Sequence, residues 1–328
     1  NTIANYLFGG FGDAEYSNVS IIAITFIIAL FTVKNVGETI KVPIDIMSII
    51  LSVLGFGGLL YGTSSISHDG WNDPIVLTTI IGGVILVALF IWRQSKLETP
   101  LLNFSVFKNT QFTIGILIMA VTMVSMIGSE TVLPMFVQNL LNRTPLDSGL
   151  ILLPGAIVMA IMSFASGGLY EKFGAKPLAL IGMMIVIITT GYFVIMDENT
   201  SSVMLATVYG IRMIGIALGL MPVMTHTMNQ LTYEMNAHGS SMTNTVQQIA
   251  GSIGTAILIT ILTQASKHYS PDMSNYDGMK RSEMLGQIKI DTLLHGYHAG
   301  FLFAVIITVV SFLCSFMLKK NTKSTEEQ

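Results

Sequence analysis

The chain has 328 residues, of which 52% are hydrophobic and only 11% are charged, and its mean hydropathy is +0.68. A soluble domain of this length does not combine so much apolar surface with so few charges, so the composition predicts an integral membrane protein. The net charge of −3 is nearly balanced and does not indicate a nucleic-acid partner.

Apolar segments of membrane-spanning length recur along the chain. A hydrocarbon core about 30 Å thick needs about 20 apolar residues in a helix. By that length we predict an all-α bundle with nine spans, the first of them short. The predicted spans are Val19–Val33, Ile44–Ser64, Pro74–Trp92, Phe112–Phe136, Ser148–Gly168, Pro177–Met196, Val203–Thr225, Ser241–Gln264 and Ala299–Leu318.

Two segments do not fit the pattern of spans and short loops. Residues 1–18 form a non-membrane segment of unclear origin before the first apolar run. Residues 264–295 are predicted to be a long outer loop, in which Met284, Leu285 and Ile288 fall at roughly helical spacing. A short interfacial helix and a plain solvated loop both explain this spacing.

The distribution of Lys and Arg predicts the orientation. If the C-terminus is cytoplasmic, alternate loops on that side hold most of the 16 basic residues, as the positive-inside rule requires. These residues are Lys34, Lys41, Arg93, Lys96, Lys108, Lys172, Lys176, Lys319, Lys320 and Lys323. We therefore expect a multi-pass protein of the cell membrane with a cytoplasmic tail at 319–328.

A charged segment joins two of the spans, with the spacing Gly167-x-Leu169-x-Glu171-Lys172-x-Gly174-x-Lys176. This pattern resembles the loop signature of the major facilitator superfamily, in which an acid, bases and turn glycines link neighbouring helices at the cytoplasmic face. Gly174 permits a tight backbone turn. The resemblance implies that these residues form a gate that opens and closes as the domain moves. Ordinary positive-inside topology explains the two lysines but not the acid and the glycines.

Further motifs resemble the fourteen-span drug:proton antiporter branch of that superfamily, the QacA/EmrB type. The two spans between 44 and 92 are similar to the central pair that twelve-span relatives lack. The other matching motifs are Pro100-Leu101-Leu102, Leu133-Pro134, Pro145-Leu146-Asp147-Ser148-Gly149, Leu153-Pro154-Gly155, Arg212-x-x-Gly215 and His238-Gly239.

The resemblance covers about Val19 to Leu318 and corresponds to the end of span six through span fourteen. It implies a partial span, two central spans and a cytoplasmic linker at 19–110, then a six-helix C-domain at 111–318. The chain is thus expected to be the C-terminal portion of a transporter whose N-terminal half is missing.

The function implied is that of a proton-coupled multidrug efflux transporter, which exports amphipathic, often cationic compounds by alternating access and confers antibiotic resistance. The partners expected are lipophilic or cationic small molecules and membrane lipid. An exporter of a dedicated lipid, peptide or metabolite, and a truncated fragment that pairs with a partner, are the alternatives.

Two charged residues lie inside predicted spans, where a charge costs about 2.5–3.5 kcal/mol on insertion scales. Glu130 can exchange a proton or attract a cation, or it can extend to the outer interface. Arg212 cannot lose its proton and therefore requires an acid, carbonyl groups or water as a partner. It belongs either to the proton or cation pathway or to a structural ion pair.

Neutral polar residues and prolines complete the set of candidates. Asn244, Gln247 and Gln248 are candidates for lining a cavity, although hydrogen bonding between helices is an equal alternative. The prolines predicted to kink spans are Pro134, Pro154 and Pro222.

Signatures of enzymes are absent from the sequence. It contains no His-Glu-x-x-His, no P-loop and no Gly-x-Ser-x-Gly motif. We therefore expect neither an enzyme nor a metal site nor a cofactor, and transport would draw its energy from a proton gradient.

Overall fold

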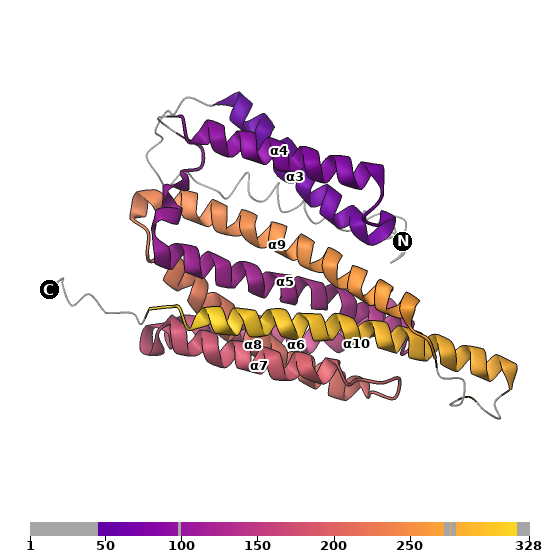
Figure 1. Ribbon diagram of the computed structural model, residues 1–328. Coiled ribbons are helices and arrows are strands. Elements are labelled where there is room, and N and C mark those ends of the chain that lie inside the picture. The colour runs from indigo at the N-terminus through magenta and orange to yellow at the C-terminus, as the bar shows by residue number, and fades with distance from the viewer. Residues whose placement is uncertain (1–44, 98–99, 272–275, 277–279, 320–328) are drawn as a thin grey trace, which may run out of the picture. The chain divides into compact units, whose positions relative to one another are not determined.

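The computed structural model describes residues 45–97, 100–271, 276 and 280–319, all of which belong to one compact unit, 45–328. Helices account for almost all of this part of the chain (Figure 1). In chain order they are α3 (Ile46–Asp69), α4 (Pro74–Gln94), a 3-10 helix η1 (Phe104–Lys108), α5 (Thr110–Asn139), α6 (Pro145–Phe173), α7 (Ala175–Phe193), α8 (Ser202–Met228), α9 (Tyr233–His268) and α10 (Arg281–Ser315).

Eight of these helices are long and apolar enough to cross a membrane. They coincide with the eight spans predicted between residues 44 and 318, and most extend several residues beyond the predicted ends. The ninth prediction, Val19–Val33, lies outside the described residues, as do residues 1–18 and the tail after Lys319. The all-helical membrane bundle is therefore confirmed for the part of the chain that the structure describes.

The predicted outer loop at 264–295 is too long. Helix α9 continues to His268 and α10 begins at Arg281, so the stretch with Met284 and Leu285 is helical and continuous with the last span. At about 1.5 Å per residue, the 35-residue α10 is about 52 Å long and exceeds a 30 Å hydrocarbon core. Its first turns extend beyond the neighbouring helices (Figure 1).

Hydrogen bonds hold this extension of α10 in place. The Tyr276 hydroxyl donates to Asp291 Oδ2 at 2.5 Å, and the Gln287 amide donates to Glu198 Oε2 at 3.4 Å. Hydrogen bonding to the Asp291 carboxylate raises the pKa of Tyr276 above its usual range. Tertiary contacts between two loops and the helix thus stabilise turns for which the sequence left a short helix and a loop as alternatives.

Helices α5 to α10 form a single bundle. Helix α8 packs on α6 and α7, α5 packs on α9, and α10 lies against α5, α7 and α9. The buried apolar residues form two clusters, one near Phe136, Phe193 and Phe301, the other near Phe112 and Met242. Short hydroxyl contacts join α5 to α10, including Ser125 to Thr308 at 2.7 Å.

Small residues permit close approach of helices in the bundle. A Cβ on Gly182 of α7 would lie 2.5 Å from the Gly215 carbonyl oxygen and the Gly219 nitrogen of α8. A Cβ on Gly254 of α9 would lie 2.4 Å from the Val124 carbonyl oxygen of α5. The backbones of these two helix pairs are therefore in direct contact, as small-residue spacing predicts.

Helices α3 and α4 form a hairpin that packs against α9 (Figure 1). Arg93 near the end of α4 donates two hydrogen bonds to the Asp45 carboxylate at 2.7 and 2.9 Å, and these bonds hold the pKa of Asp45 well below its usual range. On α9, Ser252 contacts the Thr63 hydroxyl of α3, and Thr260 accepts a hydrogen bond from Trp71. The central pair is thus attached to α9 by polar contacts and by a small apolar cluster of Ile66, Val76 and Ala256.

Candidate functional site

The predicted gate segment is mostly helical rather than a turn. Helix α6 continues through Phe173, so Gly167, Leu169, Glu171 and Lys172 lie in its last turns. Only Gly174, with φ 79° and ψ 174°, forms the connection, since α7 begins at Ala175. A residue with a side chain is strained at this positive φ, so the prediction of a tight turn at Gly174 is confirmed, and that of a longer turn is wrong.

Two lysines of this segment have identifiable contacts. Lys176 Nζ donates to the Phe316 carbonyl oxygen at the end of α10 at 2.6 Å, and Lys172 Nζ lies 5.3 Å from the centre of the Phe173 ring. Glu171 is exposed and forms no ion pair with any described residue. The basic side chains therefore satisfy local groups, and the gate role of Glu171 stays a prediction.

Arg212 occupies the interior of the bundle and is 0% exposed. Its Nε donates to the Thr190 hydroxyl of α7 at 3.2 Å, while Nη1 and Nη2 have no hydrogen-bond partner among the described residues. A buried guanidinium group with two unsatisfied nitrogens requires a nearby anion.

Glu130 provides that anion from α5. It interacts electrostatically with Arg212 and with the Tyr209 hydroxyl, although no carboxylate oxygen lies within the 4.0 Å of an ion pair. Glu130 is half-buried, and Tyr209 is 7% exposed. The structure thus brings together the two intramembrane charges that the sequence singled out, and adds Tyr209 and Thr190, which no sequence pattern marked.

A glycine makes room for this cluster. A Cβ on Gly155 of α6 would lie 2.4 Å from Cδ1 of Tyr209, so the aromatic ring occupies the space that a side chain there would take. Four helices, α5 to α8, therefore surround the cluster of Glu130, Thr190, Tyr209 and Arg212.

The three predicted kink residues lie inside unbroken helices: Pro134 in α5, Pro154 in α6 and Pro222 in α8. A proline has no N–H, so the carbonyl group four residues earlier loses its helical donor. In α5 that carbonyl belongs to Glu130 itself, and in α6 it belongs to Leu150. Each proline leaves an acceptor for another partner; the kinks at these prolines stay a prediction.

The three candidates for lining a cavity do not share one environment. Asn244 and Gln248 are exposed on α9, four residues apart and hence on the same face. Gln247 is half-buried and donates to the Met119 sulfur of α5 at 3.5 Å. The polar face of α9 therefore consists of Asn244 and Gln248, and Gln247 belongs to helix packing.

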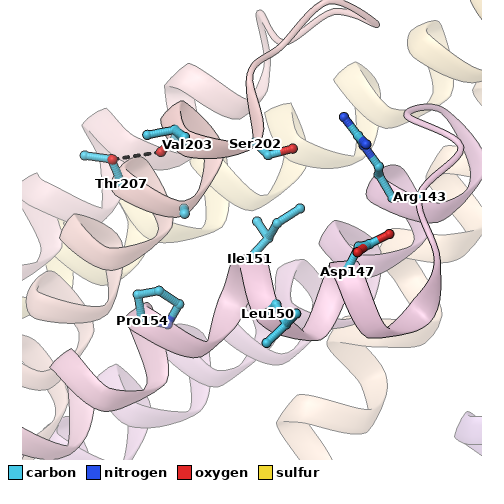
Figure 2. Close-up of a pocket in the computed structure, with 9 residues that line it drawn as sticks. Arg143, Asp147, Leu150, Ile151, Pro154, Ser202, Val203 and Thr207 are labelled. Carbon is cyan, nitrogen blue, oxygen red and sulfur yellow. Dashed lines mark hydrogen bonds between the residues drawn. The ribbon is translucent and has the colours of Figure 1, made fainter.

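An open groove that the sequence did not indicate lies between the first turns of α6 and α8 (Figure 2). Its volume is about 540 Å³, and apolar side chains form most of its lining. Arg143 and Asp147 lie at one end, and Ser202 and Thr207 on the α8 side (Figure 2). These residues come from two helices far apart in sequence, so no local motif reveals them.

Metal binding has no support in this part of the chain. No group of three His, Cys, Asp or Glu side chains that can hold a metal ion occurs among the described residues.

Comparison with known proteins identifies the family. The profile of the Major Facilitator Superfamily matches residues 14–255. An uncharacterised MFS-type transporter of Bacillus subtilis, YcnB, is 39% identical over 305 residues, which are 93% of this chain and 61% of that protein. The lincomycin resistance protein LmrB of Listeria innocua is 34% identical over 287 residues, 88% of this chain and 59% of that protein.

A more distant relative is named for resistance to several drugs. The multidrug resistance protein B homolog of Mycobacterium tuberculosis is 27% identical over 230 residues, 68% of this chain and 42% of that protein. The chain thus spans about two-fifths to three-fifths of the length of these relatives.

Proposed function

Because this chain belongs to the major facilitator superfamily, we propose that it is the C-terminal portion of a proton-coupled multidrug exporter of the fourteen-span branch. The exporter would expel amphipathic, often cationic compounds, and the chain would supply one wall of its cavity. Relatives named for resistance to lincomycin and to several drugs support export of this kind of compound. The α3–α4 pair ahead of the six-helix bundle supports the fourteen-span branch.

The buried cluster around Arg212 is the observation that carries the proposal. An arginine inside a membrane bundle is permanently charged, so its electrostatic environment depends on whether Glu130 is ionised. Ionised Glu130 attracts the two free guanidinium nitrogens and draws α5 toward α8. Protonated Glu130 loses that attraction, so binding of a proton favours a different packing of the two helices.

The polar face of α9 supplies the cavity wall. Asn244 and Gln248 are exposed in the middle of a membrane helix, where an amide without a partner is unfavourable in lipid. Such a face requires water, substrate or another protein segment. We infer that it faces the transport cavity, which the remaining spans of the full-length protein would close.

The orientation proposed has Arg93, Lys172 and Lys176 at the cytoplasmic side of the cell membrane, in accordance with the positive-inside rule. The C-terminus is then cytoplasmic, and the loops at 140–144 and 194–201 are outside. The Gly174 connection would be on the inner face and the groove between α6 and α8 on the outer face.

Ethidium transport in everted membrane vesicles tests the proposal. The protein would be the chain extended upstream to the length of its relatives, and an imposed proton gradient would drive uptake. We expect gradient-dependent uptake that Glu130→Gln abolishes. The matched control is Glu283→Gln, which removes an exposed acid in the first turn of α10 and is expected to retain transport.

The 328-residue chain provides the second arm of this experiment. One cavity wall does not enclose a substrate, so the chain by itself is expected to show no gradient-driven uptake. Unchanged transport in Glu130→Gln would contradict the proton-coupling role. Transport by the chain alone would contradict the requirement for a second wall.

A further inference from the structure

We propose that the groove between α6 and α8 is a second binding site for amphipathic cations, in which Asp147 binds the cationic group and Arg143 competes for the same carboxylate. The site would lie at the exit side of the exporter, and this role rests on the proposed function. Its ligand binding is nevertheless a property of the groove itself, separate from any gradient.

The size and lining of the groove suit the apolar body of such a ligand. A volume of about 540 Å³ falls within the range of small-molecule sites, which is about 300–1,000 Å³. Its walls are apolar: Leu150, Ile151 and Pro154 come from α6, and Val203 and Ala206 come from α8 (Figure 2). Leu150 is 57% and Val203 76% exposed, so both are available to a bound molecule.

Apart from Arg143, the polar side chains of the groove carry oxygen atoms that can accept hydrogen bonds. Both hydrogen bonds that Thr144 donates to Asp147 go to Oδ2, which leaves Oδ1 without a hydrogen-bond partner among the described residues. The Thr207 hydroxyl donates to the Val203 carbonyl oxygen at 2.8 Å and retains its lone pairs (Figure 2). Pro154 leaves the Leu150 carbonyl group without its helical donor. Oxygen acceptors that have no hydrogen atom, or whose hydrogen atom is already donated, favour a cation.

Arg143 opposes this cation and weakens the site. It attracts Asp147 electrostatically but lies beyond ion-pair distance from it, so the carboxylate is only partly compensated. Arg143 also lines an adjoining opening of about 370 Å³ that contains Glu198, a second acid with which its guanidinium group can interact. A ligand cation must therefore bind Asp147 against the electrostatic repulsion of Arg143, and a weak site of this kind suits the release of a substrate.

The inner end of the groove adjoins the buried cluster. Pro154 directly precedes Gly155, against which the Tyr209 ring packs, and Thr207 lies two residues before Tyr209 on α8. Tyr209 in turn interacts with Glu130 and Arg212. A ligand in the groove thus contacts α8, one of the two helices whose packing the proposed proton exchange would change.

Equilibrium binding of ethidium to the 328-residue chain in phosphatidylcholine nanodiscs tests the site, with fluorescence anisotropy as the readout and protein-free nanodiscs as the blank. We expect Asp147→Asn to raise Kd about threefold to tenfold, because it removes the anionic contact. We expect Arg143→Gln to lower Kd about twofold to fivefold, because it removes the competitor. Opposite signs for the two substitutions are the specific result.

Two control variants separate charge from helix stability. Asp147 is part of a capping box with Thr144, so Asp147→Asn also weakens the start of α6. Thr144→Ala weakens the same cap but keeps the carboxylate, and Asp147→Glu keeps both cap and charge; both are expected to change Kd less than twofold. Circular dichroism would verify the helix content of each variant.

The remaining outcomes overturn the proposal. Weaker binding in both Asp147→Asn and Arg143→Gln would indicate a zwitterionic ligand such as a phospholipid headgroup, and unchanged binding in both would place ethidium elsewhere. Weaker binding in Thr144→Ala would show that Asp147 acts only through the helix cap. Because no gradient is used, absence of gradient-driven transport in the longer chain would refute the proposed function and leave these binding results intact.

Discussion

Arg212 links three helices through one side chain. It extends from α8, donates to Thr190 of α7 and interacts with Glu130 of α5. Complete burial makes its few contacts energetically important, because a buried charge left without partners destabilises a protein by several kcal/mol. The neighbouring threonine provides a control, since the Thr189 hydroxyl donates only within its own helix, to Ile185 and Val186.

We predict that Thr190→Val lowers the free energy of unfolding by about 1–3 kcal/mol, because Arg212 Nε then joins the other unsatisfied nitrogens. Thr189→Val removes a hydroxyl of the same size from the same helix and is expected to change stability by less than about 0.5 kcal/mol. Reversible unfolding in mixed micelles would measure both. Equal effects of the two substitutions would contradict a specific role for the bond to Arg212.

At the scale of helices, α7 and α8 are joined by contact between their backbones. Gly182 lies against Gly215 and Gly219, and no side chain separates the two helices at that level. This contact positions α8, and with it Tyr209 and Arg212, relative to α7. Gly210 of α8 differs, because a Cβ there would meet no atom within 4 Å.

Gly182→Ala is therefore expected to force the helices apart and to destabilise the bundle by about 1–3 kcal/mol. Gly210→Ala is expected to leave stability unchanged or to raise it by up to about 1 kcal/mol, because alanine has the higher helix propensity. Thermal unfolding of the two variants in detergent measures the difference. A stable Gly182→Ala variant would show that the α7–α8 contact is not tight.

The ends of α3 and α4 are joined by an ion pair whose contribution depends on pH. Because Arg93 lowers the pKa of Asp45 below the ordinary value of 3.8, the pair contributes stability at all pH values above that value. The contribution decreases as the pH falls below it and disappears at the lower pKa of the folded state.

We predict that Asp45→Asn lowers the unfolding temperature at pH 6, and that its difference from the unsubstituted chain shrinks as the pH falls to 3. Arg93→Gln is expected to behave in the same way, because it removes the other member of the pair. Differential scanning fluorimetry across this pH range measures both. A difference that stays constant with pH would mean that hydrogen bonds to neutral groups, not the charge pair, join the helices.

At the scale of the whole molecule, the direction of insertion decides which solutions reach the groove and the Gly174 connection. Lys96 follows α4 and Asn199 precedes α8, and both are exposed. In the proposed orientation these two positions are on opposite sides of the membrane.

Cysteine labelling tests this orientation in a Cys314→Ser background. We expect a membrane-impermeant maleimide to label Asn199→Cys in intact cells, and to label Lys96→Cys only after the cells are permeabilised. Labelling of Lys96→Cys alone in intact cells would show that the protein has the opposite orientation. The groove between α6 and α8 would then be cytoplasmic.

The amino-acid sequence predicts, without a structure, the number and approximate extent of the helices from 44 to 318, since a membrane-spanning helix must be about 20 apolar residues long whatever its neighbours are. It also identified Glu130 and Arg212, because a charge inside an apolar run is visible without a structure. The family followed from local spacings such as Gly167-x-Leu169-x-Glu171, which require no tertiary information.

Contacts between residues of different helices, in contrast, depend on how the helices pack. Thr190 and Tyr209 are ordinary residues in their helices, and their contacts with the charged cluster exist because α7 and α8 pack through Gly182 and Gly215. The extension of α10 into the predicted loop depends on contacts with Tyr276 and Glu198, not on hydropathy. The groove of Arg143 and Asp147 requires α6 and α8 side by side, and the sequence encodes that juxtaposition only through the packing of the whole bundle.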